Sequence, residues 1–349
     1  MPCGRIIRDY IVQRPGCTVR AALDESPTEG SIAVTMAARG SKQRIVRMME
    51  AKEMDVSSER QQACPLCEQH KFVYLLEREY RSRTWRLARC LACGLHFTDP
   101  RPTLDDIKGF YAGTYHAELR SAGATEQIFG PKYERYIEKI RRFVVSGRTL
   151  DVGCATGLFP HMLQKLGYQA EGVELNPESL EWGRTNYRVP IHAGTMEELV
   201  DLCPASYDLI TMTDVLEHTE NPLAGLRCVN RLLKKNAHAM VTFPDIRSVK
   251  SRYYEWLARL TGRDWIWCMC HIPGHTWEFT EPTAVACFER TGFRVVDFHR
   301  SESAANITGR LSPLSIPARI FSLPLLAARY GSQMEFILRR TGDPPGPSN

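Results

Sequence analysis

The stretch T-L-D-V-G-C-A-T-G-L-F, residues 149–159, decides the fold of this chain. A short apolar run ends near an aspartate, Gly153 and Gly157 follow, and a helical pattern begins directly after them. Glycine lets the backbone turn tightly and lets a ligand approach where a side chain would clash. The turn leads into a helix amino terminus, whose unpaired N–H groups attract polar ligands. The stretch therefore predicts a strand, a glycine turn and a helix around a ligand.

The spacing of the two glycines excludes two common phosphate-binding loops. The pattern is G-x-x-x-G, whereas a dinucleotide loop has G-x-G-x-x-G and a P-loop ends in Lys-Ser or Lys-Thr. Asp151, just before the turn, places a carboxylate where a cationic or amino-bearing ligand is favoured. We therefore expect a loop that is not built first for a pyrophosphate or triphosphate.

Strand and helix patterns alternate on both sides of this stretch. A helix is expected to begin at Pro131, and further helices are expected at 158–166, 177–186, 222–233 and 282–291. The expected strands are 149–152, 170–175, 189–193, 207–213, 237–243, 294–298 and 334–338. Strands spaced by helices form parallel crossovers. The chain is therefore predicted to be α/β, with a doubly wound, mostly parallel, Rossmann-like sheet of seven strands.

Polar residues follow three of these strands at the rim where ligands of such sheets bind. Glu174 ends the second strand, where a carboxylate can accept both hydroxyls of a ribose. Met196 and Glu197 follow the third strand and are expected to flank a flat base and to accept from its exocyclic amine. Thr213 ends the fourth strand and is followed by D-V-L-E-H, residues 214–218. Together with the glycine loop after the first strand, these features follow four successive strands and indicate one nucleotide-like ligand.

These motifs resemble those of the class I S-adenosylmethionine-dependent methyltransferases. The resemblance lies in D-V-G-C-A-T-G (151–157), V-E-L (173–175), Y-D-L-I-T-M-T-D-V-L-E-H (207–218) and L-L-K-K-N-A-H-A-M-V-T-F-P-D (232–245), and it covers about residues 131–300. It implies an antiparallel last strand and S-adenosylmethionine as cofactor. By this resemblance Asp151 and Gly153 hold the methionine part of the cofactor, and Glu174 holds its ribose. Met196 and Glu197 hold the adenine region, and the backbone at Thr213 lies near the sulfonium. The same motifs include Cys154, Gly157 and Leu175.

Three histidines are candidates for the chemistry. A sulfonium methyl is already activated, so a base is needed only where the acceptor must lose a proton. His218 lies just past the fourth strand, and His271 and His275 form H-I-P-G-H; each can also simply cap or pack. The run Asp214-x-x-Glu217-His218 resembles the E-x-x-E-H of quinone-biosynthesis O-methyltransferases, in which a divalent metal can help a catechol oxygen ionise. An acidic helix start beside a histidine is the plainer interpretation.

Four cysteines form two C-x-x-C pairs, Cys64 with Cys67 and Cys90 with Cys93. Two such pairs on facing turns can present four thiolates tetrahedrally, which predicts a closed, structural zinc site. Zinc ribbons also bind nucleic acid, and the expected hairpin carries five arginines, at 78, 81, 83, 86 and 89. Glu77 and Glu79 interrupt that run, so a solvated face is favoured. Ribbon-bearing relatives in this family are associated with sugars, polysaccharides, secondary metabolites and, less often, RNA.

Composition sets the outer limits. The chain has 349 residues, and 43% of them are hydrophobic, which excludes wholesale disorder. Its net charge of +5 is too small to indicate a nucleic-acid-binding protein. No apolar stretch is long enough to span a membrane, and no secretory signal is evident at the start, so a cytoplasmic location is expected. The expected organisation is a poorly ordered leader (1–60), the zinc ribbon (61–100), a linker with a short helix (101–130), the methyltransferase core (131–300) with a lid insertion (246–280), and a final insertion, strand and tail (301–349).

The sequence thus predicts an enzyme that transfers a methyl group from S-adenosylmethionine to a small-molecule or saccharide acceptor, with O-methylation favoured. The alternative is an RNA-binding or RNA-modifying protein that uses the zinc ribbon for recognition. Steep salt dependence of RNA affinity would favour that alternative.

Overall fold

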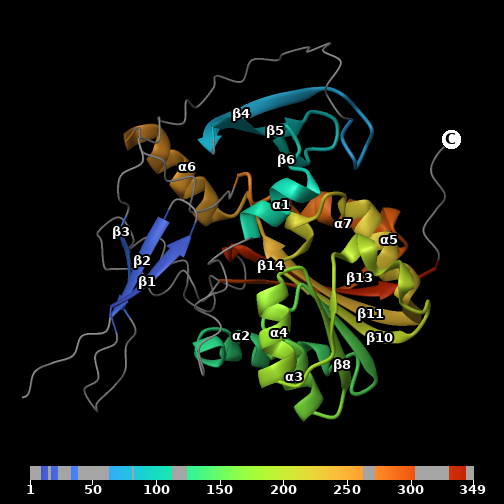
Figure 1. The fold of residues 1–349 in the computed structure, drawn as a ribbon. Helices are drawn as coiled ribbons and strands as arrows, with labels where there is room; N and C mark the ends of the chain where they lie inside the picture. Colours follow the sequence, from blue (N-terminus) through green and yellow to red (C-terminus); the bar gives the residue numbers. More distant parts are fainter. Residues whose placement is uncertain are drawn as a thin grey trace, which may run out of the picture.

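A seven-stranded sheet forms the centre of the molecule (Figure 1). The computed structural model describes residues 9–14, 17–22, 33–37, 63–80, 82–111, 124–261, 272–302 and 330–342. The strand order is β13-β14-β11-β10-β7-β8-β9. In chain order the strands are β7 (Arg148–Val152), β8 (Gln169–Glu174), β9 (Ile191–Ala193), β10 (Tyr207–Thr213), β11 (Leu233–Pro244), β13 (Phe293–Ser301) and β14 (Gln333–Arg340). β14 runs antiparallel to β11 and β13, and the other neighbours are parallel. The doubly wound fold is therefore confirmed.

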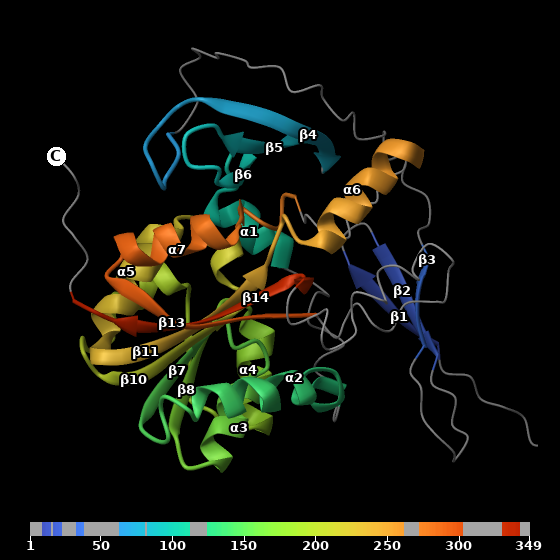
Figure 2. The same ribbon diagram turned by 180° about the vertical axis from the view of Figure 1, so that it is seen from behind.

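Helices cover both faces of this sheet (Figures 1 and 2). One face carries α2 (Ala124–Ile140), α3 (Leu158–Lys165) and α4 (Pro177–Asn186); the other carries α5 (Pro222–Leu232) and α7 (Glu281–Arg290). The prediction that a helix begins at Pro131 is wrong, because Pro131 lies inside α2. The helix continues through the proline because Tyr136 and its apolar neighbours pack one face of it against the sheet, and packing outweighs propensity.

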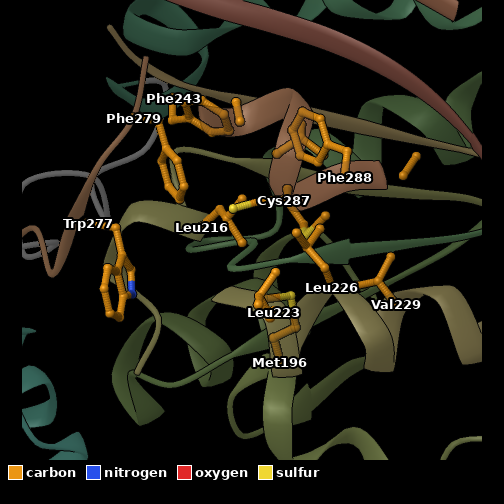
Figure 3. Packing of buried hydrophobic residues seen from close by; sticks show 14 of the residues in the cluster. Met196, Leu216, Leu223, Leu226, Val229, Phe243, Trp277, Phe279, Cys287 and Phe288 are labelled. Atoms are coloured by element: carbon orange, nitrogen blue, oxygen red, sulfur yellow. The ribbon is translucent and has the colours of Figure 1, made fainter. Parts of the chain in front are cut away.

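Alternate residues of each strand enter two cores, as expected for a sheet buried on both faces. Leu209 of β10 packs with α2 and α3, whereas Ile210 packs on the opposite side. Figure 3 shows that second core, where side chains from α5, α7 and the loops converge. Its labelled members are Met196, Leu216, Leu223, Leu226, Val229, Phe243, Trp277, Phe279, Cys287 and Phe288. This face also receives the cysteine-rich module.

The cysteine-rich segment folds as a hairpin that belongs to a larger sheet. Its strands are β4 (Phe72–Tyr80) and β5 (Arg83–Cys90), followed by β6 (His96–Asp99). The fourth strand, β12 (Trp277–Glu278), comes from the insertion that follows β11, and the order is β12-β6-β5-β4. Both views place the module above α1 (Leu104–Tyr111) and α7. The ribbon is therefore built from two distant parts of the chain.

The remaining elements lie outside these two sheets. α6 (Val249–Thr261) occupies part of the expected lid insertion. Near the start of the chain, β1 (Asp9–Arg14), β2 (Cys17–Ala22) and β3 (Ala33–Ala37) form a three-stranded antiparallel sheet where the sequence predicts no strand. Among the helices that the structure describes, none combines the length and hydrophobicity needed to cross a bilayer.

Candidate functional site

Asp151 lies near the carboxyl end of β7, at the centre of the sheet. It is 3% exposed, and its Oδ1 accepts a 2.6 Å hydrogen bond from the Thr211 hydroxyl of the neighbouring β10. Burial raises the pKa of Asp151 to about 7, and the nearby charge of Glu174 contributes in the same direction. Lys132, which pairs with Asp214, offsets this effect only in part, so a cationic group brought to this edge would meet a buried carboxylate whose charge is incompletely compensated.

The glycine loop after β7 has the backbone that its sequence predicts. Gly153 has φ +71°, and a Cβ there would lie 2.5 Å from Cγ2 of Val215. Gly157, also at positive φ, is the N-cap of α3. The amides of Gly153 and Cys154 both donate to the Val173 carbonyl, at 2.8 and 3.0 Å. Gly153 is exposed, so a ligand can lie against a surface that a side chain would fill, whereas the Cys154 side chain packs beneath the loop.

Glu174 at the end of β8 joins two adjoining segments. Its Oε2 accepts from the Ala155 amide at 2.8 Å and its Oε1 from the Asn176 amide at 2.7 Å. The two carboxylate oxygens together have about four acceptor sites, so these backbone donors leave acceptor capacity for a ligand hydroxyl. Burial raises the pKa of Glu174 although these backbone hydrogen bonds favour the carboxylate. The half-buried Leu175 follows directly. Glu174 thus lies at the carboxyl end of β8, beside the glycine loop.

Met196, which follows the third strand, does not lie at the rim where it was predicted. Met196 turns into the core, where its Sδ and Cε lie against Gly225 of α5 (Figure 3). A buried thioether cannot flank a base at the rim, so at Met196 itself the backbone alone is available to a ligand. The side chain of Glu197 lies outside the described residues. Thr213, half-buried, ends β10 as predicted.

Asp214 is paired with Lys132 of α2, a residue that the sequence analysis did not single out. Lys132 Nζ lies 2.7 Å from Asp214 Oδ2, and Gln333 of β14 also donates to this carboxylate. Burial opposes ionisation of Asp214, but Lys132 holds its pKa below the usual range. Nothing in the pattern around Lys132 distinguishes it from a surface lysine. The pair holds α2 against the rim of the sheet.

Glu217, His218 and His275 come together directly after β10. Their ligand atoms all lie within 4.8 Å of one another, and the two imidazole rings stand edge to face with centroids 4.6 Å apart. His218 and His275 were predicted separately, from segments far apart in the sequence, and the structure brings them into contact. His271 lies outside the described residues. Asp214, the first member of the predicted D-x-x-E-H face, points to Lys132 instead.

The hydrogen bonds of the two histidines set their tautomers. His218 Nδ1 lies 2.6 Å from the Gly274 carbonyl, which can only accept, so Nδ1 carries the proton. His275 Nδ1 lies 3.0 Å from Oε1 of Glu278, which orients that ring in the same way. Each Nε2 then bears a basic lone pair. Burial, together with the neighbouring His275, lowers the pKa of His218 to about 3, so this ring is neutral at physiological pH.

Glu217 is the least satisfied group of this cluster. It is 2% exposed, and neither carboxylate oxygen has a hydrogen-bond partner among the residues that the structure describes. Burial raises its pKa far above the usual range, and the charges of Asp214 and Glu278 raise it further. A buried carboxyl group without a partner is costly and indicates a ligand that compensates it. One carboxylate and two imidazoles fit a divalent cation.

The four predicted zinc ligands also converge. The Sγ atoms of Cys64 and Cys93 are 3.6 Å apart, those of Cys67 and Cys90 are 3.5 Å apart, and all four lie within 4.8 Å of one another. Four thiol groups at this spacing fit a tetrahedral zinc ion and leave no ligand position open.

The comparisons with known proteins agree with this geometry. Residues 126–297 match the family described as a methyltransferase domain. A ubiquinone biosynthesis O-methyltransferase from Xanthomonas campestris pv. campestris is 28% identical over 153 residues, which cover 41% of this chain and 61% of the relative. One from Vibrio cholerae serotype O1 is 30% identical over 109 residues, covering 30% and 44%. The chain therefore spans less than two thirds of the length of these relatives.

Solved structures include an S-adenosylmethionine-dependent methyltransferase from Mesorhizobium loti. It is 19% identical, with a TM-score of 0.43, and the match covers 62% of this chain and 99% of that one. The strand order with its antiparallel β14, the glycine loop and the family match rest on independent observations. Residues 126–297 therefore form a class I S-adenosylmethionine-dependent methyltransferase domain.

Proposed function

We propose that this protein transfers the methyl group of S-adenosylmethionine to a hydroxyl oxygen of a small molecule. The observation that carries the proposal is the cluster of Glu217, His218 and His275, which follows β10 on the rim that also holds Asp151 and Glu174. A hydroxyl acceptor must lose its proton, and this cluster is the proton-handling group beside the expected cofactor. The names of the Xanthomonas and Vibrio relatives support an oxygen acceptor.

The cofactor is to be held by the glycine loop and the two acids at its sides. Asp151 would face the amino group of the cofactor, Gly153 would leave room for its backbone approach, and Glu174 would accept its ribose hydroxyls. Since the sulfonium methyl is already activated, the protein's remaining task is to align it with the acceptor oxygen and to exclude water. Predicted contacts of Glu197 and of the backbone at Thr213 with the cofactor are part of the same proposal.

The acceptor proton can leave in two ways, and the cluster fits both. In the first, His218 Nε2 accepts the proton, although the lowered pKa of this ring makes it a weak base. In the second, Glu217, His218 and His275 hold a divalent cation, which would lower the pKa of the acceptor hydroxyl. The buried carboxyl of Glu217, which has no hydrogen-bond partner within the described part of the chain, supports the second way, and a catechol would be the matching acceptor. We further propose that Cys64, Cys67, Cys90 and Cys93 bind a structural zinc ion.

The arginines of the ribbon favour a small molecule over RNA. Arg86 pairs with Glu77 at 2.7 Å, Arg83 pairs with Asp106 at 3.2 Å, and Arg78 donates to the Ile272 carbonyl. Cations that are already engaged within the molecule contribute less to binding a phosphate backbone. A saccharide acceptor stays a second candidate from the ribbon-bearing relatives.

The test is transfer of labelled methyl from S-adenosylmethionine to four acceptor classes: a catechol, a monophenol, a saccharide fraction and total RNA. We expect label in the catechol, lowered at least about a hundredfold by His218→Ala. His192→Ala, a histidine that pairs with Glu171 on β8, is the matched control and should retain activity. Loss of activity in chelator, restored by magnesium, would select the metal mechanism, and indifference to chelator would select the base. Label only in RNA, or in no fraction, would contradict the proposal.

A further inference from the structure

Strand β6 of the ribbon borders the segment that carries His275. One edge of β6 pairs with β5, and the other pairs with β12, where Phe97 lies opposite Trp277. β12 begins two residues after His275. The last strand of the ribbon sheet, β12, is therefore separated by a single residue, Thr276, from one of the histidines of the candidate active site.

Thr98 of β6 makes two hydrogen bonds to that segment. Its amide donates to the Thr276 carbonyl at 2.9 Å, and its hydroxyl donates to the His275 carbonyl at 2.6 Å. Thr98 is fully buried, at 0% exposure. A buried carbonyl that loses its donor is costly, so the hydroxyl contributes directly to the position of the His275 backbone.

The opposite side of the same segment is bonded to the loop after β10. The Thr276 amide donates to the Glu217 carbonyl at 2.8 Å, and Trp277 Nε1 donates to the Thr219 carbonyl at 2.8 Å. His218 is bonded to the Gly274 carbonyl, as described above. Residues 274–277 are thus held between the ribbon on one side and Glu217 with His218 on the other.

The ribbon is itself fixed where β6 begins. The second cysteine knuckle leads into β6, and the Cys90 amide donates to the Leu95 carbonyl at 2.9 Å. The Arg101 guanidinium lies over the rings of Phe97 and Trp277, at 5.6 and 5.3 Å from their centroids. β6 is therefore a rigid support rather than a free edge.

We propose that Thr98 is a positioning residue for His275, and that the ribbon is thereby a structural part of the active site. The Thr98 hydroxyl fixes the His275 carbonyl, and with it the angle at which the His275 ring meets His218. The hydrogen bond between Thr98 and His275 is seen in the structure itself. Its role in methyl transfer rests on the proposed function.

The test compares three variants of the full-length protein. Thr98→Val removes the hydroxyl at nearly constant volume, and Thr98→Ser retains it. Thr276→Val is the matched control, because the buried Thr276 hydroxyl has no partner among the described residues. For each variant we would measure hydrogen exchange of the Thr276 amide, the ¹⁵N imidazole signals of His275, assigned with His275→Gln, and binding of S-adenosylhomocysteine.

We expect Thr98→Val to speed exchange of the Thr276 amide about fivefold to tenfold, and to shift or double the His275 signals, because one buried hydrogen bond is lost. Thr98→Ser and Thr276→Val should match the wild type, and cofactor-product affinity should stay unchanged throughout. With the acceptor found in the transfer assay, kcat of Thr98→Val should fall about tenfold at constant KM for the cofactor.

Unchanged exchange and unchanged His275 signals in Thr98→Val would overturn the inference, as would equal effects of Thr98→Val and Thr98→Ser. Failure of the wild-type protein to bind S-adenosylhomocysteine or to transfer methyl would instead overturn the proposed function. The exchange and NMR results need no acceptor, so the two failures can be told apart.

Discussion

Asp151 shows how one buried carboxylate can serve binding at the expense of stability. The Thr211 hydroxyl and the charge of Lys132 favour the ionised form of Asp151, but burial and the charge of Glu174, which favour the neutral form, outweigh them. The folded state therefore binds the proton more tightly than the unfolded chain. Stability from this group is fully present below the unfolded pKa near 4, and it is lost as the pH rises through about 7.

We predict that Asp151→Asn removes this pH dependence. The free energy of unfolding of the cofactor-free wild type should fall relative to that of the variant between about pH 4 and pH 7, by on the order of 2 to 4 kcal/mol. Urea unfolding across that range measures the difference. Thr211→Val should move the midpoint to higher pH, because it removes the hydrogen bond that favours the carboxylate. Parallel pH profiles of wild type and Asp151→Asn would refute this account.

At the scale of elements, local signals predicted the helices best. Pro177 and the N-cap Asn176 mark the start of α4, which matches its predicted span 177–186. β12 could not be predicted, because a two-residue strand has no periodicity and exists only through pairing with β6. The same holds for the contact of His218 with His275, which depends on two loops that meet only in the folded chain. Met196 was predicted at the rim but lies in the core, because the sequence does not show that Gly225 of α5 leaves space for its side chain.

Gly183 provides a test of how closely α4 approaches the glycine loop. A Cβ at this position would lie 2.6 Å from the Thr156 carbonyl oxygen. Alanine normally stabilises a helix interior relative to glycine, but here we predict that Gly183→Ala lowers the free energy of unfolding by about 1 to 3 kcal/mol. Thr185→Ala, at an exposed position of the same helix, is the control and should be neutral or stabilising, because alanine is the better helix former. Chemical denaturation of both variants decides; equal effects would count against the packing described.

For the whole molecule, the ribbon and the methyltransferase domain share one hydrophobic core. Cys64, Leu66 and Phe97 of the ribbon belong to the same cluster as Trp277 and Phe288. The Arg290 side chain of α7 also donates to the Leu66 carbonyl. The sequence predicted the zinc ligands from their spacing but placed them in a separate module, because shared burial between distant segments leaves no local pattern.

We predict that loss of zinc destabilises the whole molecule in one transition. Cys93→Ala should lower the melting temperature by about 5 °C or more and abolish stoichiometric zinc, while Cys203→Ala, an exposed cysteine outside the cluster, should change neither. Differential scanning calorimetry with metal analysis measures both. Two transitions, of which only the smaller responds to Cys93→Ala, would show that the ribbon folds independently.

The measurement that bears most directly on the methyltransferase assignment is calorimetric titration of the intact protein with S-adenosylhomocysteine. We predict a single site, weakened at least about tenfold by Glu174→Ala, because this acid accepts a hydrogen bond from the Ala155 amide of the glycine loop and is proposed to accept the ribose hydroxyls. Glu171→Ala, on the same strand but paired with Arg148 and His192, should bind as the wild type does. No heat with the wild-type protein, or equal affinity of the wild type and Glu174→Ala, would contradict the account.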